Sequence, residues 1–370
     1  MITQMMKSWT IHGLVVLRMD MRLSWLPTYA SKMRDVLLAG EQTRDSDAPS
    51  VTVNWVSKLE LEGTREIEPG IRVSPTAIVD EQYGVRFEIA RGRHITLSCI
   101  DSAMEWLEWS LLLALLAAGK AMVHGASLEK DGRAILFPSW GGVGKTAIVA
   151  RFVESFGWRF LGDDLCLVDQ SGRVLAFPKP MVLYPYHRSV FPAVFSAGKG
   201  PIAPSIANNL LDRVGNYVKP MLRKVPGLLQ LARRLNPQSV RLAPSEVFVG
   251  ALARDAQLAG VIWLDRVVGI FETSAQHDQV DVASRVVGST LNEYDRRCVR
   301  ATNTAMGLGI VKFDEYLGRW NKTLGEAFAP VPQSIAQIPA DVPVSQVPFE
   351  VRAYAEGMLD GVSHVLSPSR

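Results

Sequence analysis

Apolar and β-branched residues dominate several short runs in the first hundred residues of the chain. Turn-prone residues separate these runs, and a polar stretch occupies residues 42–50. Short runs of this composition between turn residues are typical of β-strands. The predicted strands are residues 11–18, 51–61, 84–90 and 94–100. We therefore expect residues 1–100 to form a β-rich N-terminal domain.

The pattern changes after residue 101, where apolar residues recur at helical steps of three and four. The residues at these steps are Met104, Leu107, Leu111, Leu115 and Ala118. From residue 122 onwards, short apolar strands alternate with a Gly-rich loop and a further helical segment, as in α/β proteins. The elements predicted here are a strand at 134–137, a helix at 146–153 and a strand at 159–162. The predicted fold class of residues 101–325 is therefore an α/β core.

Glycine and proline divide the remainder of the chain. Their density in residues 195–245 indicates an insertion or lid over the core. A strand is predicted at 261–264 and one helix at 280–299. Five prolines mark residues 326–348 as a linker. A last amphipathic helix in residues 349–370, with Val351, Tyr354, Met358 and Val362 on one face, is expected to dock on the protein or on a partner.

Composition excludes several classes of protein. The 370 residues are 48% hydrophobic and 21% charged, which is typical of a soluble globular protein. A net charge of +3 gives no strong reason to expect nucleic acid as a partner. The three cysteines are scattered, the N-terminus lacks a clear signal-peptide pattern, and the longest apolar stretch is too short for a bilayer. We therefore expect a cytoplasmic protein without a transmembrane segment.

The loop between the predicted strand at 134–137 and the following helix has the composition of a phosphate-binding loop. Its sequence ends in Gly141-Gly142-Val143-Gly144-Lys145-Thr146. In such loops successive backbone N–H groups surround a polyphosphate, the lysine reaches the outer phosphates, and the threonine hydroxyl ligates Mg²⁺. The first glycine of the usual motif is replaced by Ser139, which restricts the turn but leaves the N–H donors in place. The alternative is a Gly-rich turn without a ligand.

Two acidic residues, Asp163 and Asp164, follow the predicted strand at 159–162. Neighbouring side chains at a strand end point in different directions, so one carboxylate can face Mg²⁺ and the other the nucleophile. A carboxylate near the reacting hydroxyl can accept its proton while the metal and Lys145 balance the phosphoryl charge. The alternative is structural, because aspartate after a strand often caps a turn. His124, on an apolar segment, is by itself more typical of a core residue.

Three motifs together resemble the catalytic domain of the HPr kinase/phosphorylase family and its kinase-like relatives. They are Val123-His124-Gly125, the loop ending in Lys145-Thr146, and Gly162-Asp163-Asp164-Leu165, in the order and approximate spacing of that family. The resemblance covers about residues 85–185 and extends loosely to residue 300. It implies a P-loop kinase core similar to the C-terminal domain of HPr kinase, with Asp163 as general base and Asp164 and His124 as its supporting neighbours.

The resemblance also implies ATP and Mg²⁺ as cofactors, and the metal ligands predicted for this chain are Thr146 and Asp164. Ser139, Gly141 and Ala147 differ from the motif of HPr kinases, and the C-terminal segment implicated in phosphorolysis is not found. The sequence is therefore similar to a divergent relative that phosphorylates another acceptor.

The predicted function is an ATP- and Mg²⁺-dependent phosphotransferase that phosphorylates a hydroxyl on a peptide, a protein or a small metabolite. The alternative is a nucleotide-binding regulatory or ATPase module without kinase activity. A GTPase is disfavoured because Asn321-Lys322-Thr323-Leu324 lacks the aspartate that reads guanine, and the six histidines lack the spacing of a metal hydrolase. The basic segment 213–241 either contacts phosphates, holds an anionic acceptor, contacts a membrane surface or forms a solvated face. A homo-oligomer is left open.

Overall fold

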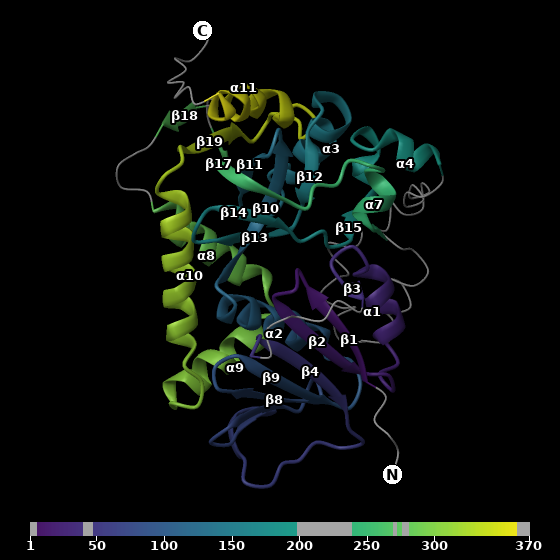
Figure 1. Ribbon diagram of the computed structural model, residues 1–370, viewed down its shortest axis with the longest axis vertical. Helices are drawn as coiled ribbons and strands as arrows, with labels where there is room; N and C mark the ends of the chain where they lie inside the picture. The colour runs from purple at the N-terminus through teal and green to yellow at the C-terminus, as the bar shows by residue number, and fades with distance from the viewer. Residues whose placement is uncertain (1–5, 40–46, 198–238, 269–271, 276–280, 361–370) are drawn as a thin grey trace.

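Two large β-sheets and the helices around them make up the described part of the protein. The computed structural model describes residues 6–39, 47–197, 239–268, 272–275 and 281–360. A β-rich N-terminal region is followed by a mixed α/β region, as the composition of the short runs predicts. In Figure 1 the N-terminal sheet lies below and the second sheet above. The lid predicted at 195–245 and the basic segment 213–241 lie largely outside the described residues.

The N-terminal sheet has the strand order β3-β1-β2-β4-β9-β8-β7-β6-β5. Its strands are β1 (Met6–Ile11), β2 (Val15–Asp20), β3 (Leu38–Ala39), β4 (Ser50–Trp55), β5 (Arg65–Glu68), β6 (Ile71–Val73), β7 (Ala77–Asp80), β8 (Val85–Ala90) and β9 (His94–Cys99). Helix α1 (Leu26–Lys32) lies between β2 and β3 in the chain. Residues 11–18, expected as one strand, contain the tight turn from β1 to β2, where His12 has a positive φ of 51°.

Helix α2 (Met104–Ala117) links the two regions and is buried on every side. Ten of its fourteen residues are buried, including the unbroken run from Trp109 to Leu116. A helix that is apolar all round requires partners on all faces, and α2 packs against β4, β9 and the long strand β10 (Lys120–Lys130). The two regions therefore share one hydrophobic core. Within the described ranges no helix has both the length and the apolar character needed to cross a membrane.

The second sheet contains β10 and seven further strands. They are β11 (Arg133–Pro138), β12 (Arg159–Gly162), β13 (Leu165–Asp169), β14 (Arg173–Ala176), β17 (Asp255–Val267), β18 (Glu272–Ala275) and β19 (Gln333–Pro339). Strands β11 and β12 both run antiparallel to β10 and pair with its opposite edges. Their carboxyl ends consequently lie at the same end of the sheet. A separate pair consists of β15 (Met181–Leu183) and β16 (Val240–Leu242).

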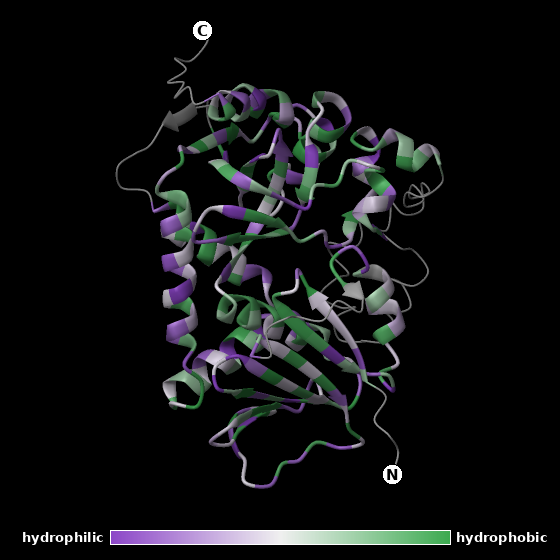
Figure 2. Cartoon of the chain, viewed as in Figure 1, coloured by the Kyte–Doolittle hydropathy of each residue, from purple (hydrophilic) through white to green (hydrophobic). Residues whose placement is uncertain are grey.

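The remaining helices are α3 (Lys145–Phe156), the 3₁₀ helix η1 (Pro185–Ser189), α4 (Pro192–Ser196), α7 (Pro244–Val247), α8 (Val282–Glu293), α9 (Arg296–Gly307), α10 (Phe313–Phe328) and α11 (Val347–Leu359). Of these, α3, α8, α10 and α11 pack against strands of the second sheet, whereas α9 packs against α2, α10 and β7. Helix α10 alternates between hydrophilic and hydrophobic residues (Figure 2), because only one of its faces, which carries Trp320 and Leu324, is buried.

Two predictions for the C-terminal part are wrong. Residues 280–299, expected as one helix, form α8 and α9, because Asp295 accepts hydrogen bonds from the N–H groups of Arg297 and Cys298 and begins a new helix there. Residues 326–348, expected as a linker, contain β19, which pairs with β17 in the sheet. Helix α11 packs against α3 and β17, so the final predicted helix docks on the protein itself. Residues 361–370, including Val362, lie outside the described residues.

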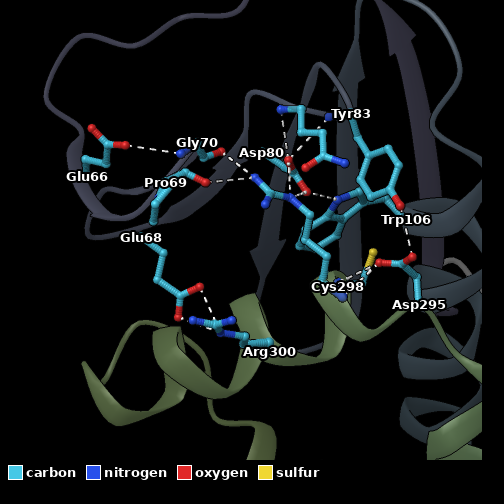
Figure 3. A network of polar contacts seen from close by, with 12 residues as sticks. Glu66, Glu68, Pro69, Gly70, Asp80, Tyr83, Trp106, Asp295, Cys298 and Arg300 are labelled. Atoms are coloured by element: carbon cyan, nitrogen blue, oxygen red, sulfur yellow. Dashed lines mark hydrogen bonds and ion pairs between the residues drawn. The ribbon is translucent and has the colours of Figure 1, made fainter. Parts of the chain in front are cut away.

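A buried polar network joins the N-terminal sheet to α9 (Figure 3). Asp80, at the end of β7, is fully buried and accepts hydrogen bonds from Arg297 Nε at 2.9 Å and from Trp106 Nε1 at 3.2 Å. Tyr83 donates its hydroxyl to Asp295 at 2.9 Å. Because Asp295 and Arg297 directly follow the end of α8, this network fixes the position of that helix end relative to the N-terminal sheet.

Candidate functional site

The strand arrangement brings the three predicted motifs together. The phosphate loop follows β11, Asp163 and Asp164 follow β12, and His124 lies on β10 between these two strands. Small residues are required where these segments of backbone approach one another closely. A Cβ atom at Gly125 would lie 2.8 Å from the Cα of Pro138, and one at Gly162 would lie 2.3 Å from the Leu165 carbonyl oxygen. The glycines of the predicted motifs therefore allow the strand ends to meet.

The phosphate loop presents an open backbone at the start of α3. Gly142 and Gly144 have φ angles of 80° and 117°, in the region that favours glycine. Apart from their chain neighbours, no atom of the described residues lies within 4 Å of a Cβ built at Gly141 or Gly142, so these residues leave this part of the loop open to a ligand. Val143 is buried and anchors the loop in the core. The N-terminus of the twelve-residue helix α3 adds N–H donors that favour an anion.

Lys145 folds back across the loop. Its Nζ atom donates to the Ser139 carbonyl oxygen at 3.2 Å, to Ser139 Oγ at 3.1 Å and to the Trp140 carbonyl oxygen at 3.0 Å. Burial lowers the pKa of Lys145. Ser139 is buried, pairs with Leu264 through a parallel bridge, and is not among the residues with positive φ. Serine is accommodated at this position because the backbone there does not require glycine.

Asp163 is held against the phosphate loop. Thr146 Oγ1 donates a hydrogen bond to Asp163 Oδ2 at 3.0 Å. The other oxygen, Oδ1, is buried and has no hydrogen-bond partner among the described residues. Burial, together with the nearby charge of Asp164, raises the pKa of Asp163 to about 6. Asp163 is therefore ionised at neutral pH yet close to its protonation point.

Asp164 points away from the phosphate loop. Its side chain is 50% exposed, and its Oδ2 atom lies 3.4 Å from Lys179 Nζ. Partial burial raises the pKa of Asp164, but attraction to Lys179 outweighs burial and holds the pKa below its ordinary value. The two adjacent carboxylates thus have opposite pKa shifts. The structure brings Asp163 to Thr146, whereas Asp164, expected as a metal ligand beside Thr146, contacts Lys179 and His124.

His124 lies between two carboxylates. Its Nε2 atom is 3.7 Å from Asp164 and its Nδ1 atom 3.4 Å from Glu293, at the end of α8. Burial, reinforced by the positive charge of Lys145, lowers the pKa of His124 to about 4, so the imidazole is neutral at physiological pH. The backbone N–H of His124 donates a hydrogen bond to Thr290 Oγ1 at 2.9 Å, which connects β10 to α8. His124 therefore adds no charge to this cluster.

Three further charged residues belong to this cluster and were not predicted as site residues. Lys179 Nζ lies 3.5 Å from Glu108 on α2 as well as 3.4 Å from Asp164. Glu293 has a raised pKa because it is partly buried and faces Asp164. Neither glutamate stands in a recognisable motif, and the only sequence signal for Lys179 is its place between Pro178 and Pro180.

The donor set for a metal is limited to oxygen. Among the described residues, no three His, Cys, Asp or Glu side chains converge as a metal site of their own. The Thr146 hydroxyl and the Asp163 carboxylate are both hard oxygen donors, the kind of ligand that Mg²⁺ prefers. Neither a protein-family model nor a curated protein sequence matches the chain. We therefore infer function from the geometry of the site.

Proposed function

We propose that the protein is an ATP- and Mg²⁺-dependent phosphotransferase with a P-loop kinase core that phosphorylates a hydroxyl group. The observation that carries this proposal is the contact between Thr146 and Asp163, which leaves a buried carboxylate oxygen unpaired beside the phosphate loop. A loop that only turned the chain from strand to helix would not need this oxygen, since burying it without a partner is unfavourable.

The residues of the loop and of the start of α3 are suited to bind a nucleoside triphosphate. The open backbone at Gly141–Gly144 and the N-terminus of α3 supply N–H donors for phosphate oxygens. Lys145 is within reach of the same loop and provides a positive charge for the outer phosphates. The Thr146 hydroxyl would hold Mg²⁺, which offsets the negative charge of the phosphates when bound, and Asp163 would stay unligated as the base.

The carboxylate of Asp163 is suited to accept the acceptor's proton. In the proposed reaction the hydroxyl oxygen bonds to the γ-phosphorus while the bond between that phosphorus and the ADP oxygen breaks. The hydroxyl proton moves to Asp163, whose pKa of about 6 keeps it ionised at neutral pH. Asp164 and Lys179 remain as an ion pair beside it.

Nucleotide binding tests this proposal most directly. We expect a fluorescent ATP analogue to bind in the presence of Mg²⁺, and Lys145→Ala to weaken binding by about 10- to 100-fold through loss of charged hydrogen bonds. Lys58→Ala removes an exposed lysine in the N-terminal region and serves as the matched control. Transfer of ³²P from γ-labelled ATP to a panel of alcohols then separates a kinase from a binding module. Absence of nucleotide binding with Mg²⁺ present would overturn the proposal.

A further inference from the structure

A cavity of about 60 Å³ is lined by Asp164, the chain neighbour of Asp163. Its walls come from both regions of the protein. Helix α1 contributes Tyr29, α2 contributes Glu108 and Leu111, and the second region contributes Asp164, Lys179 and Glu293. The N-terminal region therefore completes a compartment that begins at the candidate site.

One wall carries an unsatisfied hydroxyl. Tyr29 is 3% exposed, lines the cavity, and its hydroxyl has no hydrogen-bond partner among the described residues. Leaving a buried hydroxyl unpaired costs about 1–3 kcal/mol in typical proteins. None of the described residues compensates for this loss, so a ligand in the cavity is a suitable partner for this group.

The charge of the cavity restricts its ligand. Among the described residues that line the cavity, three carboxylates, from Glu108, Asp164 and Glu293, accompany one ammonium group, from Lys179. An excess of hydrogen-bond acceptors favours a ligand rich in donors and disfavours an anion. A volume of about 60 Å³ has room for roughly four water-sized groups, since one water needs about 10–15 Å³. The cavity is therefore suited to a compact group of few atoms.

We propose that this cavity is the acceptor subsite and that it takes a small alcohol, rich in hydrogen-bond donors and without negative charge, of the size of an amino alcohol. The inference rests on the proposed phosphotransferase activity. The acceptor's hydroxyl lies at the Asp164 end, next to Asp163, and its remaining donors face Glu108 and the Tyr29 hydroxyl. Tyr29 is thus a specificity residue supplied by the N-terminal region.

The test uses the full-length protein, ATP, Mg²⁺ and three probes of similar size: ethanolamine, ethylene glycol and glycolate. We expect phosphorylation of ethanolamine or ethylene glycol to exceed that of glycolate by at least about tenfold. A contact between the glycolate carboxylate and the carboxylates of the cavity lowers affinity by more than about tenfold. Tyr29→Phe should raise the KM of the preferred alcohol about tenfold while leaving the KM of ATP unchanged. It removes only an unpaired hydroxyl, so this variant is expected to fold normally.

The outcomes separate the two proposals. If the protein binds ATP but phosphorylates glycolate as well as the other probes, phosphorylates none of the three, or is indifferent to Tyr29→Phe, the acceptor subsite is overturned and the nucleotide site is not. If ATP does not bind with Mg²⁺ present, the phosphotransferase proposal itself fails. Leu111→Phe, which fills the cavity from α2, provides a second variant and should abolish phosphorylation of the alcohol without changing nucleotide affinity.

Discussion

The turn at Asp163 and Asp164 divides the candidate site into two sides that are built from different parts of the chain. The nucleotide side consists of the loop, Lys145, Thr146 and Asp163, all within one short stretch of chain. The cavity side consists of Asp164 and residues from α1, α2, the segment after β14 and the end of α8. The proposed phosphate site is thus built from local backbone, whereas the proposed acceptor compartment is assembled from distant segments.

The two sides also differ electrostatically, although their carboxylates are adjacent in sequence. Asp163 is enclosed beside the loop and has a raised pKa, while Asp164 is half exposed, is paired with Lys179 and has a lowered pKa. Environments that separate the pKa values of neighbouring groups are typical of acid–base assignments. The raised pKa of Asp163 suits a general base, whereas Asp164 lines the cavity.

Replacing Asp163 should produce the largest difference between the two sides. We expect Asp163→Asn to lower phosphoryl transfer by about 10²- to 10⁴-fold, because general-base catalysis contributes that much. Nucleotide binding should persist, because Lys145 and the loop backbone remain in place. The measurement is steady-state transfer from labelled ATP, together with the dissociation constant of a fluorescent ATP analogue.

Asp131→Asn, in the exposed turn between β10 and β11, is the matched control for this substitution. Asparagine tolerates the positive φ of 53° found there, so neither activity nor folding should change. If Asp163→Asn retained most of the transfer activity, Asp163 would not be the base, and the division of roles between the two sides would be wrong.

Substitutions that weaken the attachment of the N-terminal sheet to α9 should affect the cavity side and not the nucleotide side. Asp80→Asn removes the charge that pairs with Arg297 inside the network of Figure 3, and breaking a buried pair costs about 3–5 kcal/mol. We expect about 3 kcal/mol lower stability by urea unfolding, because Arg297 retains some solvent contact. Nucleotide affinity of the folded protein should be unchanged.

Glu68 and Arg300 form a pair at the same interface in which Arg300 is exposed and Glu68 partly buried, and this pair provides the control for Asp80→Asn (Figure 3). Glu68→Gln should cost no more than about 1 kcal/mol, as is typical of surface ion pairs. Equal losses of stability from the two substitutions would show that burial of Asp80 does not matter to the attachment of the N-terminal sheet.

The pH dependence distinguishes the carboxylates. Below pH 6 Asp163 is protonated and cannot accept a proton, so activity should fall about tenfold per pH unit on the acid side and level off above pH 7. Removing the neighbouring charge by Asp164→Asn should move the midpoint to lower pH, because that charge helps to raise the pKa of Asp163. The measurement is kcat/KM for ATP between pH 4.5 and 8, and a midpoint that moved upwards would contradict the assignment.

The sequence predicts the secondary structure of the nucleotide side well because its residues are consecutive, while nucleotide binding there stays a prediction. Strand β11, the loop and α3 follow from local hydrophobic pattern and glycine content, and the structure places them as expected. The cavity side depends on which helices pack against the second sheet, and no local pattern encodes that choice. Tyr29 and Glu108 lie on helices whose partners are set by tertiary contacts, so their role was not predictable. Strand β19 was missed because flanking prolines suggested a linker, although its own residues pair with β17.

The smallest expected change in nucleotide affinity comes from a substitution at the first position of the loop, where Ser139 replaces the usual glycine. Ser139→Gly removes the Oγ atom that accepts a hydrogen bond from Lys145 at 3.1 Å but keeps the carbonyl contact with Lys145. Because the backbone at Ser139 has no positive φ, nucleotide affinity should change by less than about threefold. Glycine in an extended segment costs about 0.5–1 kcal/mol, which thermal unfolding can detect. Gly144→Ala is the contrasting variant, since φ is 117° there and Val347 lies 3.5 Å from the added Cβ. A larger loss of affinity in Ser139→Gly than in Gly144→Ala would mean that the side chain at position 139, rather than the open backbone of the loop, determines phosphate binding.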